Sequence, residues 1–182
     1  MPGLNKRTLQ RIRVPLGFIF AVLFIFFSRP TALTIGIGSG IALLGLLTRT
    51  WAAGHIRKAE ALATTGPYGY TRNPLYLGSF ILGVGFTVAA GVWWLAIVFA
   101  VLYLGIYLPV MRVEEEDIRR IFGAEFEEYK RHVPLFIPRL TVWRNTASKF
   151  DHRLYLRYRE YRAALGAAIA MVVLAAKAWF LG

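Results

Sequence analysis

The sequence contains no cysteine and little acidic charge. Of its 182 residues, 10 are Asp or Glu and 22 are Lys or Arg, so charged residues make up only 18% of the chain. The absence of cysteine excludes disulfides, thiolate metal sites and a cysteine nucleophile. Hydrophobic residues make up 57% of the chain, compared with about 45–50% in soluble domains. This composition excludes intrinsic disorder and favours a protein that lies in a membrane.

Five apolar runs, almost free of charge, account for this composition. They cover residues 14–27, 32–47, 75–90, 92–110 and 163–176. A transmembrane helix needs about 20 residues, a length that these runs reach with flanking residues at the interface. They lack the outward polar face of a soluble bundle, so the sequence predicts an all-α integral membrane protein with about five transmembrane helices. In the second run, Gly36 and Gly40 are predicted to be a small-residue pair for close helix packing.

Basic residues lie almost entirely on one side of the predicted spans. Twenty of the 22 Lys and Arg residues precede the first run, separate the second from the third, or separate the fourth from the fifth. Because cytoplasmic loops carry the basic excess, this predicts a cytoplasmic N-terminus and an outer C-terminus. The net charge of +12 then follows from membrane topology, with the lipid bilayer as the expected partner in place of nucleic acid.

Two segments, residues 51–74 and 112–162, are polar and long enough to build a site. Both are predicted to face the cytoplasm, so they can meet at the ends of the helices. In the first, Pro74 follows Asn73 at a predicted helix start, which leaves neighbouring amides free for an anion or a carboxylate. In the second, four consecutive acids at 114–117 follow directly on a predicted span. Carboxylates at this level can bind a sulfonium or an ammonium group.

The residues alone leave a simpler interpretation of each segment open. The tyrosines and the arginine of the first segment are also typical of an aromatic belt at the headgroup level. The acidic run of the second is also typical of a solvated helix with ion pairs four positions apart, such as Glu115 with Arg119.

The two segments carry motifs in a specific order. Residues 66–78 have the pattern Gly-Pro-Tyr-x-Tyr-x-Arg-Asn-Pro-x-Tyr-x-Gly, and a hairpin of spans separates them from Glu-Glu-x-x-Ile-x-x-x-Phe-Gly-x-x-Phe-x-x-Tyr and Pro138. Together these motifs resemble the isoprenylcysteine carboxyl methyltransferase and phospholipid methyltransferase superfamily, over residues 51–138. The chain is thus expected to consist of a methyltransferase core, residues 1–138, and a basic interfacial segment with a last transmembrane helix, residues 139–182.

The resemblance implies an integral-membrane methyltransferase that binds S-adenosylmethionine in a cytoplasmic pocket between the helix ends and the tail. By motif position, Glu115 and Glu116 lie at the amino-acid or sulfonium end of the cofactor, and Arg112 faces the acceptor. Glu116 is also the expected base for an ammonium acceptor. The cofactor-binding residues implied in this way are Leu62, Tyr68, Asn73, Pro74, Leu75, Tyr76, Glu115, Glu116, Tyr129 and Arg131, and the catalytic residues are Arg112 and Glu116. No metal is expected, because methyl transfer requires none.

Two positions depart from the family pattern. The commonest family form has His where this chain has Asn73, and the eukaryotic prenylcysteine enzymes have His where this chain has Glu60. Asn exchanges hydrogen bonds but cannot shuttle protons near neutral pH. The expected reaction is methyl transfer to a lipid-like or hydrophobic acceptor, such as an isoprenylcysteine-type carboxylate. The alternatives are a phospholipid amine, a small hydrophobic thiol or alcohol, and a non-catalytic membrane protein that retains the fold.

Overall fold

The computed structural model describes residues 6–57, 61–144 and 149–181, and every regular element within these ranges is a helix. The helices are α1 (Lys6–Phe27), α2 (Ala32–Ala53), the short 3-10 helix η1 (Gly66–Gly69), α3 (Pro74–Ala89), α4 (Trp93–His132), α5 (His152–Arg157) and α6 (Tyr161–Leu181). This confirms the predicted all-α class. Each predicted apolar run coincides with one of the five long helices.

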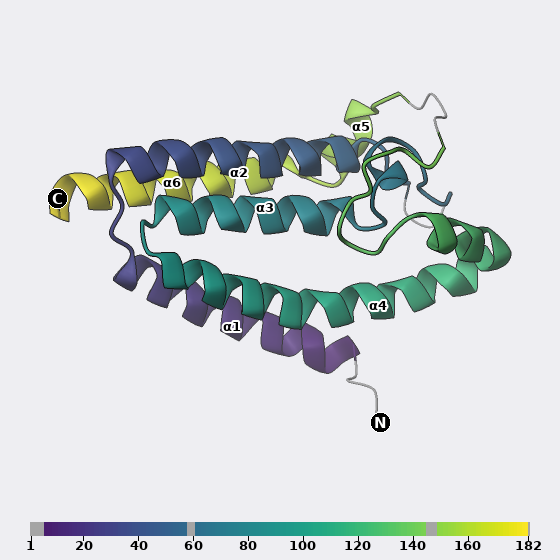
Figure 1. Ribbon diagram of the computed structural model, residues 1–182, viewed down its shortest axis with the longest axis horizontal. Coiled ribbons are helices and arrows are strands. Elements are labelled where there is room, and N and C mark those ends of the chain that lie inside the picture. Colours follow the sequence, from purple (N-terminus) through teal and green to yellow (C-terminus); the bar gives the residue numbers. More distant parts are fainter. Residues whose placement is uncertain (1–5, 58–60, 145–148, 182) are drawn as a thin grey trace.

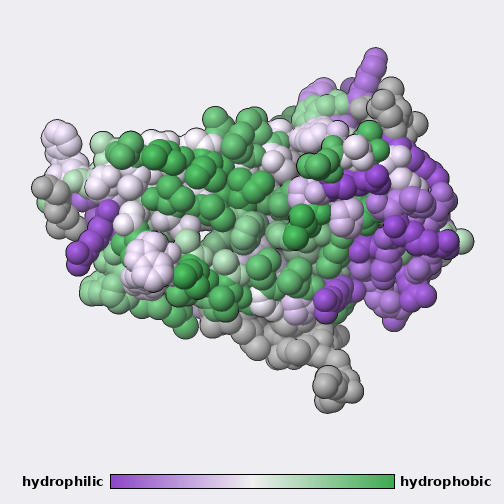
Figure 2. Space-filling view, viewed as in Figure 1, coloured by the Kyte–Doolittle hydropathy of each residue, from purple (hydrophilic) through white to green (hydrophobic). Residues whose placement is uncertain are grey.

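Three helices are long and apolar enough to cross a membrane: Ala32–Ala53, Trp93–His132 and Tyr161–Phe180. The apolar parts of the other two, Gly17–Phe27 and Pro74–Ala89, are shorter. At 1.5 Å per residue, the 16 residues of α3 extend about 24 Å, less than the ~30 Å hydrocarbon core. Apolar side chains cover the flanks of the helices, and hydrophilic ones gather at one end (Figure 2). The protein is therefore an integral membrane protein, whereas the count of five spans remains a prediction.

The long helices form two layers (Figure 1). Helices α2, α3 and α6 lie in one layer, and α1 and α4 lie in the other. The irregular segments, η1, α5 and the last turns of α4 gather where α2 ends and α3 begins, and we call this region the polar end. Both polar segments singled out from the sequence therefore lie at the same end of the helices.

Small residues set the distance between α2 and α3. A Cβ atom on Gly38 would lie 2.5 Å from the carbonyl oxygen of Gly85, and one on Gly45 would lie 2.4 Å from the backbone of α3. The two backbones are thus in contact, as small residues permit in a membrane. The prediction that Gly36 and Gly40 make the contact is wrong, because a Cβ on either meets no atom within 4 Å. Residues two positions apart face opposite sides of a helix, so the glycines next to Gly38 point away from α3.

Two tight turns and a lysine fasten the end of the bundle opposite the polar end. The α1–α2 and α3–α4 turns meet where the backbone N–H of Arg29 donates to the carbonyl of Ala90 at 2.7 Å. Gly91 has a φ of 70°, and a Cβ there would lie 2.4 Å from the carbonyl oxygen of Arg29. Lys177 of α6 donates to the carbonyl oxygen of Phe26 at 3.1 Å. Helix α6 is thereby tied to the end of α1 as well.

Helix α4 continues well beyond the predicted span at 92–110 and carries the acidic run on the same helix. It is 40 residues long and ends at His132. Near its end, Gly123 has φ 51° and ψ −119°, which interrupts the helical geometry and favours glycine. The chain turns back at this point (Figure 1). Phe126 and Tyr129, which follow the turn, are buried.

Candidate functional site

Hydrogen bonds join the segment before α3 to the segment that follows the kink of α4. The backbone N–H of Arg139 donates to the carbonyl of Tyr70 at 3.0 Å. The hydroxyl of Tyr129 donates to the carbonyl of Tyr68 at 2.8 Å. The structure therefore brings the two polar segments of the sequence together over the start of α3.

Asn73 links the start of α3 to the chain that follows α4. Its Nδ2 donates to the carbonyl of Leu135 at 3.0 Å, and the Thr71 hydroxyl donates to the carbonyl of Phe136 at 3.0 Å. Pro74 is the first residue of the helix, and Asn73 makes no side-chain cap bond to it. The amide of Asn73 thus serves as a hydrogen-bond donor to a loop, a role that needs no proton transfer.

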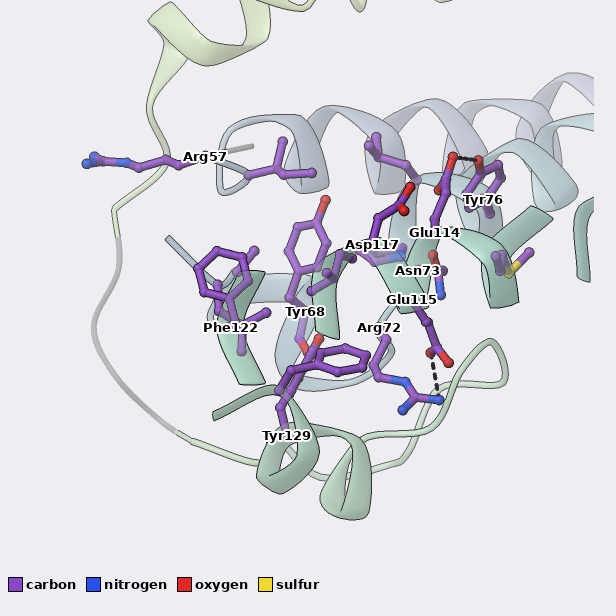
Figure 3. Close-up of a pocket in the computed structure, with 18 of the residues that line it drawn as sticks. Arg57, Tyr68, Arg72, Asn73, Tyr76, Glu114, Glu115, Asp117, Phe122 and Tyr129 are labelled. Carbon is purple, nitrogen blue, oxygen red and sulfur yellow. Dashed lines mark hydrogen bonds and ion pairs between the residues drawn. The ribbon is translucent and has the colours of Figure 1, made fainter. Parts of the chain in front are cut away.

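A cavity of about 740 Å³ lies between these segments and helices α2, α3 and α4 (Figure 3). Of the residues implied by the family motifs, those that line it are Leu62, Tyr68, Asn73, Pro74, Leu75, Tyr76, Glu115 and Tyr129. The other charged residues that line it are Arg49, Arg57, Arg72, Glu114 and Asp117. Its volume falls in the range of ~300–1,000 Å³ that is typical of small-molecule sites.

Arg112 and Glu116 do not line this cavity. They line a neighbouring cleft of about 380 Å³, together with Arg119 and Lys130. The cavity and the cleft have Arg72 among their shared lining residues, so the two spaces adjoin. The two residues implied to be catalytic therefore lie beside the implied cofactor pocket, outside its lining.

Arg131 and Glu60 complete the set of residues singled out from the sequence. Arg131 is exposed near the end of α4 and lines neither the cavity nor the cleft. The buried rings of Phe126 and Tyr129 form the wall at this part of α4 instead. Glu60 lies outside the described residues.

The helical periodicity of α4 explains this division. Its cavity-lining residues are Tyr107, Met111, Glu114, Glu115, Asp117, Ile118, Phe122, Phe126 and Tyr129. Apart from Asp117, they recur three or four positions apart, as residues on one face of a helix do. Arg112 and Glu116 are offset from that face by about 100°, one residue of helical rotation. This spacing is visible in the sequence, and it would have identified Glu114 as a lining residue and set Glu116 apart.

A buried ion pair forms the wall between the cavity and the cleft. Arg72 and Glu115 approach to 2.9 Å, with side chains 9% and 11% exposed. The prediction that Glu115 pairs with Arg119 along the helix is wrong: Glu115 also contacts Lys130 at 3.8 Å, whereas Arg119 pairs with Glu127 at 2.8 Å. Burial lowers the pKa of Arg72, and Glu115 raises it. The paired carboxylate thus opposes the cost of burying this guanidinium.

Two tyrosine hydroxyls border the cavity, and they differ in whether they have a hydrogen-bond partner. Tyr76 donates to Glu114 at 3.0 Å, as the dashed line in Figure 3 shows. Tyr68 is 5% exposed, and its hydroxyl oxygen has no hydrogen-bond partner within the described structure. Burial raises the pKa of Tyr68, and Tyr129 and Glu160 add to the effect. Tyr68 therefore offers an uncharged, unpaired hydroxyl at the cavity wall.

Three further residues at the cavity have no counterpart in the sequence analysis. Arg49 of α2 and Ser79 of α3 line the cavity, and Glu160, just before α6, pairs with Arg49 at 2.6 Å. Arg49 and Glu160 lie 111 positions apart. Local sequence patterns connect residues a few positions apart, so they contain no signal for this pair.

Comparison with known proteins places the cavity in a family context. The family model of the phospholipid methyltransferases matches residues 16–125. The chain belongs to this family. The matched region includes α2, η1, α3 and the part of α4 that carries Glu114 and Glu115. In this phospholipid methyltransferase family member, Glu160 and the whole of α6 lie beyond the matched region.

Three curated relatives of this family member illustrate its range. It is 37% identical over 123 residues to the nickel-cobalt-cadmium resistance protein NccN of Alcaligenes xylosoxydans xylosoxydans, over 66% of this chain and 56% of that protein. It is 35% identical over 165 residues to the cobalt-zinc-cadmium resistance protein CzcN of Cupriavidus metallidurans, and this match covers 81% of this chain and 73% of that protein. It is 34% identical over 135 residues to the protein-S-isoprenylcysteine O-methyltransferase of Saccharomyces cerevisiae, and this match covers 67% of this chain and 56% of that protein. The chain thus spans 56% of the length of two of these relatives. No solved structure is significantly similar to it.

Proposed function

We propose that the protein is an integral-membrane methyltransferase that transfers the methyl group of S-adenosylmethionine to a lipid-like or otherwise hydrophobic acceptor. One observation carries the proposal: Asn73, from the first family motif, and Glu114 and Glu115, from the second, line the same cavity. A single small molecule can therefore contact both motifs at once.

The chemistry of the cavity fits S-adenosylmethionine. Glu114, Glu115 and Asp117 bring negative charge to the lining, which attracts a sulfonium cation. The unpaired hydroxyl of Tyr68 is available to a ribose or an amino-acid group. Leu62 and its apolar neighbours offer the kind of surface on which an adenine ring packs.

S-adenosylmethionine supplies a methyl group on a sulfonium, and its transfer is an in-line displacement. The bond from the acceptor atom to the methyl carbon forms while the carbon–sulfur bond breaks, and the electron pair of that bond stays on sulfur. The protein acts mainly by holding the two reactants in line, and positioning of this kind can lower a barrier by about 7–11 kcal/mol.

We propose that the cleft beside the cavity holds the polar group of the acceptor. Arg112 is placed to attract an anionic group, and Glu116 is placed to take a proton from an ammonium. A carboxylate acceptor already presents a lone pair and needs no base. The cleft lies where the apolar part of α4 ends, so a membrane-bound acceptor can reach it from the side.

We further propose that the polar end faces the cytoplasm. The segments at this end, residues 49–72 and 112–162, contain most of the basic residues of the chain, as expected of the cytoplasmic side. Soluble S-adenosylmethionine is available in the cytoplasm. The N-terminus would then lie inside and the C-terminus outside.

A labelling experiment tests the proposed reaction. Purified protein in lipid nanodiscs is titrated with S-adenosylmethionine, and membranes that contain it are incubated with the methyl-labelled cofactor. We expect binding and label in the lipid-soluble fraction, and base-labile label would identify a carboxylate as the acceptor. Label confined to small water-soluble or volatile products would favour a thiol or an alcohol. Failure of the wild-type protein to bind would favour a non-catalytic membrane protein.

A further inference from the structure

Arg49 joins three helices at the wall of the cavity. Its Nε and Nη2 atoms donate to the same carboxylate oxygen of Glu160, at 3.1 and 2.6 Å. Its Nη1 donates to the hydroxyl of Ser79 and, at 3.4 Å, to the carbonyl of Leu75. These contacts use the guanidinium on every side, so its position is set by α3 and by the chain that leads into α6.

Glu160 is held in place by its own backbone. Its N–H donates to the carbonyl of Tyr155 at 3.3 Å, and its carbonyl accepts from Ala163 at 3.0 Å. Arg159, directly before it, has a φ of 55°, a left-handed conformation that non-glycine residues rarely adopt. The side chain of Glu160 is 13% exposed and that of Arg49 is 21% exposed. The pair is therefore largely protected from water. Its charges act more strongly in this environment than they would in solvent.

Glu160 offsets one of the positive charges at the wall of the cavity. The lining includes three arginines (Arg49, Arg57, Arg72) and three acids (Glu114, Glu115, Asp117), so their formal charges cancel. Glu160 is not part of the lining, but its ion pair with Arg49 offsets the positive charge that Arg49 brings to the lining. Both members of the pair also act on the Tyr68 hydroxyl: burial chiefly raises the pKa of Tyr68, Glu160 raises it further, and Arg49 opposes this.

We propose that Glu160 is a positioning residue that fixes Arg49 and offsets its positive charge, so that the cavity prefers the cationic methyl donor to the neutral product. The inference rests on the proposed function. S-adenosylmethionine carries a positive sulfonium, whereas S-adenosylhomocysteine, the product that remains after transfer, has an uncharged thioether. With the charge of Arg49 offset, the cavity binds the cationic donor more tightly, whereas its affinity for the uncharged product changes little. The segment that leads into the last helix, beyond the region that the family model matches, thus contributes to the site.

Binding of the two ligands by charge variants tests this inference. Dissociation constants are measured by calorimetry on the full chain in nanodiscs. In Glu160→Gln the positive charge of Arg49 is no longer offset, and a unit positive charge about 10 Å from a cation weakens the binding of that cation roughly tenfold at an effective dielectric near 20. We expect the affinity for S-adenosylmethionine to fall by about tenfold and that for S-adenosylhomocysteine to fall less than about twofold. Arg49→Gln should shift the preference in the opposite direction.

The double variant Arg49→Gln/Glu160→Gln separates charge from structure. It removes both charges, leaves no buried unpaired ion and restores the net charge, so the preference for the donor should return toward the wild-type value. The matched control is Glu128→Gln, which breaks an exposed ion pair of 2.9 Å with Arg144 and should leave both affinities unchanged. Two outcomes would overturn the inference: an equal loss of affinity for both ligands in Glu160→Gln, or a double variant whose preference between the ligands is the same as that of Glu160→Gln. Failure of the wild type to bind either ligand would instead overturn the proposed function.

Discussion

Tyr68 and Tyr129 illustrate, at the scale of single residues, how two buried hydroxyls serve different purposes. The side chains are 5% and 3% exposed. Tyr129 donates to the carbonyl of Tyr68 at 2.8 Å, whereas the hydroxyl of Tyr68 has no partner in the described part of the chain. One hydroxyl therefore stabilises the fold, and the other is left for a ligand.

Phenylalanine substitutions at these two positions should have separate effects. Tyr68→Phe should weaken S-adenosylmethionine binding by about 3- to 10-fold, the equivalent of one hydrogen bond, with little change in stability. Tyr129→Phe leaves a buried carbonyl unpaired and should lower the free energy of unfolding by about 1–3 kcal/mol. Calorimetric titration and thermal denaturation in nanodiscs measure the two quantities. A loss of stability in Tyr68→Phe, with unchanged binding, would contradict the assignment.

Whether a residue of the site could be predicted from the sequence depends on how far away in the sequence its partner lies. Asn73, Glu115 and their neighbours were predictable, because each belongs to a short motif. The spacing of the α4 residues was also present in the sequence, but it becomes informative only when the helix is known to continue past the membrane. The contact between Arg49 and Glu160 was not predictable, because only the packing of α6 beside α2 brings the two together.

At the scale of elements, glycine contacts determine how α2 and α3 pack. Gly45→Ala places a methyl group 2.4 Å from the backbone of α3, which the helices can accommodate only by moving apart. We expect a loss of about 1–3 kcal/mol of stability, as in other overpacked contacts. Gly36→Ala is the matched control: its Cβ meets nothing within 4 Å, and alanine is a better helix former by about 1 kcal/mol. Denaturation of the two variants should therefore shift in opposite directions, and equal shifts would refute the contact.

The sequence predicted the positions of the helices more accurately than it predicted their lengths. Each apolar run marks a helix, because an uncharged segment in lipid has to satisfy its backbone groups internally. The extension of α4 to His132 was missed, because Glu and Arg form helices as readily as apolar residues do. A hydropathy change marks the membrane boundary but does not mark the end of a helix.

At the scale of the whole molecule, the chain offers a direct test of its orientation in the membrane. Because it contains no cysteine, single cysteines can be labelled without background. Arg29 lies in an exposed turn opposite the polar end, and Glu125 lies on the exposed surface of the polar end. The two variants for this test are Arg29→Cys and Glu125→Cys. In intact cells, a membrane-impermeant maleimide should label Arg29→Cys, and Glu125→Cys should react only after permeabilisation. The reverse pattern would place the site outside the cell.

The fastening of the bundle at one end also determines how its other end can open. The two turns around Ala90 and the Lys177 contact hold all five long helices together at the end far from the cavity. From Trp93 to Met111, α4 measures about 27 Å, so a tilt of about 5° about the fastened end would displace its cavity wall by about 2 Å. A small angular change of α4 would thus widen the cavity, while the contacts at the fastened end stay in place.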